Sequence, residues 1–238
     1  MQTTAQPQNS RYNIYSKIHK ALRAFMADTL QRCGRTDWED AADCHSTLEQ
    51  IRELMTVCYS HLEHENEFLH AAMEERRPGS STATHIDHHE HVLAIKSFLA
   101  DAHAIEQTPP VLRTAVGASM YRRLALFVAE NFEHMAVEET DNAAVLCACY
   151  SDEEILEIEG RIIANVPPQI SPIIMRWMLP AISAQERALM LAGMRQKAPA
   201  EAFDGVMHMI RPLLGARDWD KLNRALRCES RAEDSVAA

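Results

Sequence analysis

The segment HLEHENEFLH, residues 61–70, combines three histidines and three glutamates within a stretch that has helical spacing. At about 100° per residue, His61 and Glu65 fall on the apolar face of this helix. The apolar face is formed by Ile51, Leu54, Cys58, Leu62, Leu69 and Ala72. The outer set, which we expect to face solvent, comprises His64, Glu67 and His70. A buried ionised glutamate is costly unless a cation or strong hydrogen-bond donors compensate it, so the inner pair needs a chemical explanation.

Composition around this segment favours an all-helical chain. Among 238 residues there are only 7 glycines and 10 prolines, and few segments alternate apolar and polar residues with the period of a strand. Breaks fall at Cys33-Gly34, at residues 77–81 and at Pro109-Pro110, where helix-ending residues gather. Short connections between long helices predict an up-and-down four-helix bundle. Its helices are expected at residues 11–32, 46–76, 84–106 and 111–142.

After about residue 150 the predicted helices become shorter. Ser151 with Glu154, and Ser183 with Glu186, match the capping box that begins a helix. Pro199 fits the first turn of a further helix that runs to about Leu214. We therefore divide the chain into a four-helix bundle, residues 1–150, which contains the candidate ligands described below, and a helical C-terminal extension of unknown role, residues 151–238. At their helical spacing, the methionines of the extension are expected to be core residues: Met175, Met178, Met190, Met194, Met207 and Met209.

Charge and targeting signals limit the possible partners. The formal net charge of −10 argues against nucleic acid and anionic membrane surfaces. The N-terminal stretch MQTTAQPQNS lacks the pattern of a signal peptide, and no apolar run reaches the length needed to span a bilayer. Six cysteines without a disulfide framework suit a reducing compartment. We expect a cytoplasmic protein whose partner is small, with a further protein partner or self-association possible through the C-terminal helices.

The other long helices repeat the inward histidine pattern. In the fourth helix, a stripe through Leu124 and Phe127 continues to His134 and Glu138. The third helix offers a histidine pair with the same spacing of four, although His88 projects to that face as well, and the first helix has one histidine beside its apolar stripe. These ligand candidates are His19, His61, Glu65, His85, His89, His134 and Glu138. Imidazole and carboxylate donors suit iron, manganese or zinc, and the number of donors suits two ions that share carboxylates.

In this order, the motifs resemble those of hemerythrin-like domains, also described as the HHE cation-binding family. The resemblance covers about residues 11–145 and rests on the lone His19, His61-x-x-x-Glu65, His85-x-x-x-His89 and His134 followed by Glu138-Glu139. It implies a non-haem di-iron centre of two Fe ions held by the five histidines, with Glu65 as a bridging carboxylate. It further implies binding of a small diatomic ligand such as O₂ or NO.

The second bridging carboxylate has two candidates. Oxygen-carrying members of the family place an aspartate five residues after the last histidine, where this chain has Glu139. Iron-sensing members place a glutamate four residues after it, where this chain has Glu138. Helical projection favours Glu138, because a separation of four keeps it over His134.

Two other metal sites and two functions compete. Ferritin-like di-iron proteins need two Glu-x-x-His motifs, and only Glu67 to His70 has that spacing. A catalytic zinc site would use three protein ligands and leave the other candidates unexplained. Within the hemerythrin-like interpretation, the chain either binds or senses O₂, NO or iron, or is a di-iron oxidase or peroxidase-type enzyme that acts on O₂ or peroxide. We favour binding or sensing, because the motifs supply ligands and no identifiable substrate pocket.

Overall fold

The computed structural model describes residues 11–236, with side chains as far as Cys228, and this part of the chain is all-α with no strand. The polar stretch 1–10 that was examined for a signal peptide lies outside the described residues. None of the described helices is long and apolar enough to cross a membrane. In chain order the elements are α1 (Ser16–Arg35), α2 (Ala41–His64), η1 (Glu65–His70), α3 (Ala71–Arg76), α4 (Thr82–Gln107), α5 (Pro110–Val137), η2 (Glu138–Asn142), α6 (Ala143–Cys149), α7 (Asp152–Asn165), α8 (Ser171–Ala181), α9 (Ala184–Lys197), α10 (Ala200–Ile210), η3 (Arg211–Leu213) and α11 (Ala216–Val236).

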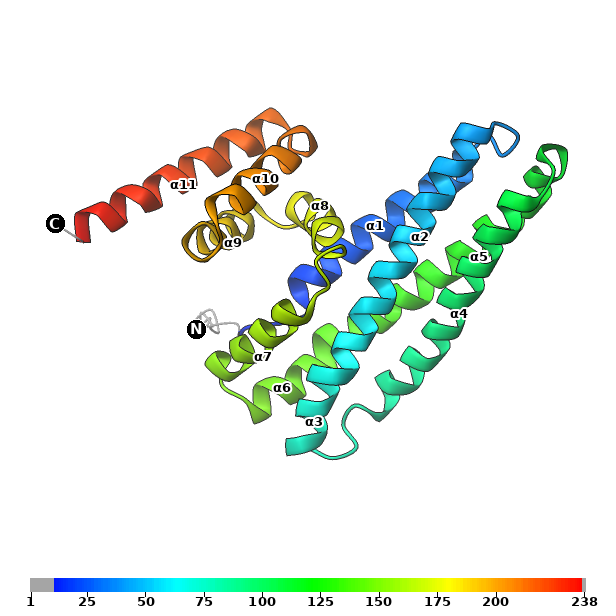
Figure 1. The fold of residues 1–238 in the computed structure, drawn as a ribbon. Helices are drawn as coiled ribbons and strands as arrows, with labels where there is room; N and C mark the ends of the chain where they lie inside the picture. Colours follow the sequence, from blue (N-terminus) through cyan, green and yellow to red (C-terminus); the bar gives the residue numbers. More distant parts are fainter. Residues whose placement is uncertain (1–10, 237–238) are drawn as a thin grey trace, which may run out of the picture.

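Four long helices pack in a ring and form the body of the molecule (Figure 1). Helices α1 and α4 each pack against both α2 and α5. Two of these helices are longer than their α-helical parts, because α2 continues through η1 into α3 and α5 continues through η2 into α6. The breaks predicted at residues 77–81 and at Pro109-Pro110 are confirmed, whereas α1 runs past Cys33-Gly34 and ends at Arg35. The first helix begins at Ser16 and the second at Ala41. The second helix begins earlier than predicted because the Asp40 carboxylate accepts from the backbone N–H of Asp43 and caps it.

The turn between α3 and α4 is held by one carboxylate. Gly79 has a positive φ of 85°, which a residue with a side chain adopts only at a cost. Glu74 accepts from the backbone N–H groups of Gly79, at 2.6 Å, and Ser81, at 2.9 Å. These hydrogen bonds lower the pKa of Glu74 to about 2. The turn therefore fixes where α4 begins, and with it the rotational setting of the histidines on α4.

Two π-helical turns interrupt the long helices, and each begins at a glutamate of the candidate site. In η1 and η2 the backbone follows i→i+5 spacing in place of i→i+4. The wider turn brings His70 inward behind Glu65, and Asn142 inward behind Glu138, so both side chains are buried. The expectation that His70 faces solvent is therefore wrong, because it assumed an uninterrupted period of 3.6 residues. In the same outer set Glu67 is exposed and His64 is half-buried.

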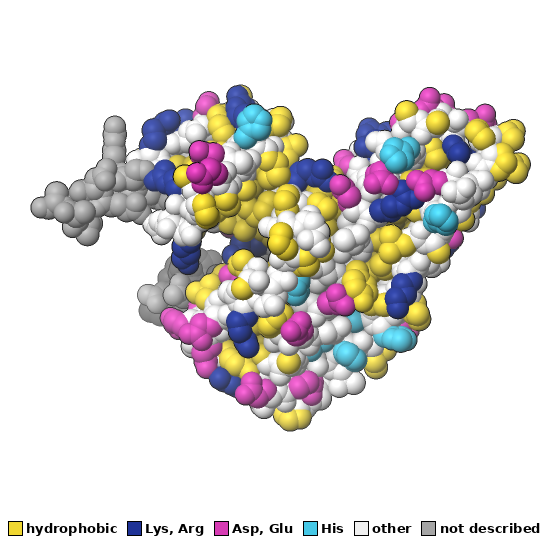
Figure 2. Space-filling model, viewed as in Figure 1, with side chains coloured by type: hydrophobic (Ala, Val, Ile, Leu, Met, Phe, Trp, Pro, Cys, Tyr) yellow, Lys and Arg dark blue, Asp and Glu magenta, His cyan; other side chains and the backbone are white. Residues whose placement is uncertain are grey.

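The shorter helices that follow residue 150 pack onto the bundle. Both predicted capping boxes are present, at Ser151 and at Ser183. Helix α8 lies against α1 and α2, where the Trp177 ring stacks on Phe25 with centroids 4.3 Å apart. The methionines of this region belong to its hydrophobic core, as predicted, with Met178 buried and the other five partly buried. Figure 2 shows hydrophobic side chains gathered on these helices beside the bundle.

Candidate metal centre

Six titratable side chains converge in the interior of the bundle, from all four long helices. They are His19 of α1, His61 of α2, Glu65 of η1, His88 of α4, His134 of α5 and Glu138 of η2. Five of them are buried, and His61 retains 12% side-chain exposure. The density of buried charge in a helical interior requires compensation from within the site.

The six side chains form two overlapping groups that share both glutamates. His19 and His61 belong to one group, and His88 and His134 belong to the other. In each group the candidate ligand atoms lie within 4.8 Å of one another. Each group therefore offers two imidazole nitrogens and two carboxylate oxygens, which is the donor set of two neighbouring cations bridged by carboxylates.

Glu65 divides its two oxygens between the groups. Its Oε1 lies 3.2 Å from Nε2 of His61 and 3.6 Å from Nε2 of His19. Its Oε2 lies 3.5 Å from Nε2 of His88. One oxygen thus faces each group, as a bridging carboxylate requires.

Glu138 repeats this arrangement from the opposite helix. Its Oε2 lies 3.4 Å from Nε2 of His19. Its Oε1 lies 3.4 Å from Nε2 of His88 and 3.3 Å from Nε2 of His134. Donor atoms bound at about 2.1 Å to one cation lie about 3.0–3.4 Å from one another, and the observed separations are close to that range.

Hydrogen bonds on the outer side of three rings set which ring nitrogen faces the interior without a proton. Nδ1 of His19 lies 3.1 Å from a Glu139 carboxylate oxygen, and Nδ1 of His134 lies 3.2 Å from one of Asp87. Nδ1 of His88 lies 2.9 Å from Oδ1 of Asn66. Because each of these partners is an acceptor, Nδ1 carries the proton in the neutral ring and Nε2 presents a lone pair to the interior.

The contact between His88 and His134 is the sharpest indication that a cation belongs here. Their Nε2 atoms are 3.0 Å apart. Since both rings donate through Nδ1, two lone pairs face each other unless a positive charge lies between or beside them. Nε2 of His19 and His61 and all four carboxylate oxygens of Glu65 and Glu138 are likewise buried without a hydrogen-bond partner. These donors fit a metal ion and leave a purely hydrogen-bonded core unsatisfied.

Protonation equilibria respond to the same crowding. Burial opposes charge on His19, but its hydrogen bond to Glu139 and the nearby carboxylate of Glu65 outweigh burial and raise its pKa to about 9. Burial lowers the pKa of His61 to about 4. Burial would raise the pKa of Glu138, yet the imidazoles of His134 and His88, close to its carboxylate, hold that pKa below its ordinary value. Without a cation, therefore, a proton on His19 partly compensates the buried carboxylates.

Five of the seven predicted ligand candidates lie in this cluster: His19, His61, Glu65, His134 and Glu138. The structure does not bring His85 and His89 to it, because both project from α4 to the exposed side. Thr84, His88 and His91 form the inner face of α4 instead. This placement corrects the expectation that His85 and His89 are the ligands from the third helix; His88, which also projects to that face, lies in the cluster instead.

Glu139, the alternative to Glu138, lies outside the cluster and contacts its edge. It accepts from His19 and from the Arg23 guanidinium, the latter at 2.5 Å. Hydrogen bonds from His19 and Arg23 lower the pKa of Glu139 to about 2. Glu138 takes the inner position because it is one helical turn from His134, whereas Glu139 is rotated about 100° further.

Two buried histidines beside the cluster were not predicted from the sequence. The His70 ring stacks on His88 with centroids 4.7 Å apart, and His91 meets His134 edge-on at 4.9 Å. Burial lowers the pKa of each to about 4. His91 follows His88 by three residues, so that spacing could have indicated it. His70 is brought inward by a π turn, for which the sequence offers no periodic signal.

The fold and the cluster define an all-helical protein with a buried His/Glu centre that could bind metal. Comparison with protein families, curated proteins and solved structures gives no match. The assignment of function therefore depends on the site itself.

Proposed function

We propose that the chain holds a non-haem di-iron centre within a hemerythrin-like, up-and-down four-helix bundle and uses it to bind or sense O₂, NO or iron. His19 and His61 would hold one ion, and His88 and His134 the other. Glu65 and Glu138 would bridge the two. The resemblance of the sequence motifs supports this proposal, and so does the sharing of both glutamates between two groups of donors.

The single observation that carries the proposal is the set of buried donors that have no partner. Four carboxylate oxygens and two imidazole nitrogens are unsatisfied, and the remaining two nitrogens face each other at 3.0 Å. Leaving one buried polar group unsatisfied costs about 1–3 kcal/mol, and more for charged groups, so the whole set is affordable only with a compensating charge. Two divalent cations would supply that charge.

Donor chemistry is compatible with iron, and the resemblance of the motifs to hemerythrin-like domains favours iron among the metals that fit. Both groups contain only imidazole and carboxylate donors, which suit iron, manganese or zinc. A pair of iron ions would supply redox chemistry and open coordination positions for a diatomic ligand. The chain itself orients His19, His88 and His134 through Glu139, Asn66 and Asp87, and thereby prepares each Nε2 to bind.

An oxidase or peroxidase-type enzyme that acts on O₂ or peroxide is the second candidate. The buried Tyr15 favours it, because its ring lies 5.4 Å from that of His19 and its hydroxyl can donate a proton beside the centre. Binding or sensing is preferred, since the geometry shows a ligand set and no relay from Tyr15 to solvent among the described residues.

Elemental analysis of protein grown with ample iron tests the proposal. We expect close to two iron ions per chain. Glu65→Ala should lose most of the iron, because it removes a carboxylate that faces both groups, whereas Glu67→Ala, in the same π turn but exposed, should retain it. A stoichiometric single zinc, or equal iron in the two variants, would contradict the proposed centre.

A further inference from the structure

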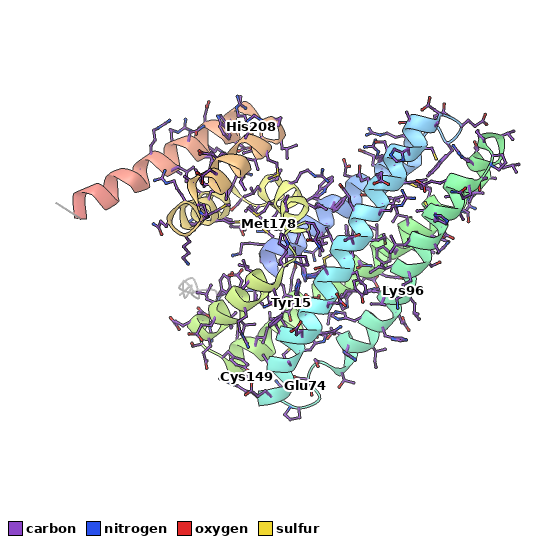
Figure 3. All side chains as sticks on the ribbon, in the orientation of Figure 1. Tyr15, Glu74, Lys96, Cys149, Met178 and His208 are labelled. Atoms are coloured by element: carbon purple, nitrogen blue, oxygen red, sulfur yellow. The ribbon has the colours of Figure 1, made fainter. Side chains whose placement is uncertain are left out.

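A cavity of about 200 Å³ lies between the bundle and the helices that follow residue 150. Its walls come from α1, α2, η1, α7, α8 and α9, so it exists only because the extension packs on the bundle. Two of the residues that line it are labelled in Figure 3: Tyr15, which directly precedes α1, and Met178 of α8. Motif spacing does not predict this cavity, because the residues that line it are far apart in the chain.

The floor of the cavity is the candidate metal centre. His61 and Glu65 both line it. His61 is the most exposed of the six cluster side chains, with 12% of its side-chain surface accessible. A molecule in the cavity would therefore contact the group formed with His19, and the group formed by His88 and His134 lies behind it.

Most of the residues that line the walls have aliphatic or thioether side chains. Those that carry the argument are Ile18, Ile162, Val166, Ile174, Met175 and Met178. Flexible methionines let such a wall adjust to an occupant's shape. Binding of an apolar molecule against such walls removes apolar surface from water and is therefore favourable. A polar molecule would find few hydrogen-bond partners there.

Apart from Glu65 in the floor, the acidic and basic residues that line the cavity are paired with each other. Lys17 lies 3.1 Å from a Glu159 carboxylate oxygen, and the Tyr12 hydroxyl donates to the same carboxylate at 2.7 Å. An anionic occupant would have to displace Glu159 from Lys17, and a cationic one would have to displace Lys17. The pairing therefore favours a neutral occupant.

Volume limits the size of that occupant. A dry cavity of about 150 Å³ lined by Leu, Ile and Phe binds benzene. The cavity described here is slightly larger and similarly lined. It suits one aromatic ring or a short branched hydrocarbon, and it is much larger than a diatomic gas requires.

We propose that this cavity binds a neutral, apolar organic molecule of about the size of benzene or toluene, against the His61 side of the metal centre. That the bound molecule lies beside a metal ion rests on the proposed function. The binding itself rests only on the cavity.

The test uses the full-length purified chain, treated with chelator so that no metal ion can bind a carboxylate, with benzene as the probe and benzoate as its anionic counterpart. We expect calorimetry to show saturable binding of benzene and at least tenfold weaker binding of benzoate. Ile162→Phe, which fills the cavity from α7, should weaken benzene binding at least tenfold. Leu156→Phe is the matched control, because Leu156 lies on the same helix, is 48% exposed and does not line the cavity.

A second measurement keeps the test decisive if Ile162→Phe does not fold. In the wild-type, zinc-loaded chain, benzene should shift the NMR resonances of the His61 ring and leave those of His134 in place. Absence of saturable benzene binding, tighter binding of benzoate, or shifts confined to His134 would overturn the inference. If benzene binds as described while iron analysis finds no metal, the cavity assignment stands and the proposed function fails. If the chain binds two irons but no benzene, the proposed function stands and the cavity assignment fails.

Discussion

Replacing His88 with alanine separates the observed face of α4 from the one expected from the sequence. His88 is 1% exposed and supplies one of the two imidazoles of its group, whereas its neighbour His89 is exposed. The matched pair of variants is therefore His88→Ala and His89→Ala. Both remove the same atoms from the same helix, and only His88→Ala removes a donor from the cluster.

The magnitude follows from linkage between metal binding and folding. An ion present at about 100 to 1,000 times its Kd stabilises the folded chain by about 3–4 kcal/mol. For a chain of this length, 1 kcal/mol shifts Tm by about 2–4 °C, so each ion should raise Tm by roughly 6–16 °C. Wild type and His89→Ala should lose the contribution of two ions when chelated. His88→Ala should lose only about half as much.

The assay is thermal unfolding followed by circular dichroism, with and without chelator, for all three proteins. Comparing loaded with chelated samples of the same variant cancels the cavity that His88→Ala leaves in the interior. If His89→Ala halved the metal-dependent shift and His88→Ala left it intact, the assigned face of α4 would be wrong. A shift of zero in wild type would refute metal binding altogether.

Two further predictions concern groups around the site and at the far end of the bundle. Glu139→Gln should weaken binding of the ion held by His19 about 10–100-fold in a competition titration with a chelator, because Glu139 orients that ring; unchanged affinity would exclude that role. Gly117→Ala should destabilise the fold by about 1–3 kcal/mol in urea unfolding, since its Cβ would lie 2.2 Å from the buried Trp38 ring. Gly160→Ala, with nothing within 4 Å, should stabilise by up to about 1 kcal/mol, and equal effects of the two glycine changes would contradict the packing described.

Local rules predicted the helices well because their causes are local. Ser151 and Ser183 form the capping boxes that their spacing indicates, and Pro110 begins α5 at a position where its missing N–H costs nothing. Glu138 could be preferred to Glu139 because one α-helical turn still separates it from His134. Each of these predictions depends on a few consecutive residues and on regular geometry.

The remainder of the site depends on features that period and spacing do not contain. On α4, four histidines within the seven positions 85–91 make several faces of the helix equally polar, and only tertiary packing selects His88. His70 turns inward because the helix widens at Glu65. The cavity at His61 requires contacts between residues about 100 positions apart, such as those with Ile162.

Because of the two π turns, the structure near the centre depends more on the number of residues in each turn than on which polar residues they are. Helix α2 directs His61 inward, while α3, on the other side of η1, packs Met73 against a separate core that includes Leu146 of α6. In a regular α-helix the direction of His61 would determine the direction of Met73. The extra residue in the π turn changes that relation, so that each side chain can face its own core. Exchanging the exposed Glu67 for another polar residue should be harmless, whereas deleting it would rotate α3 by about 100° relative to the histidines above it. Tolerance to substitution and intolerance to deletion should therefore occur at the same position.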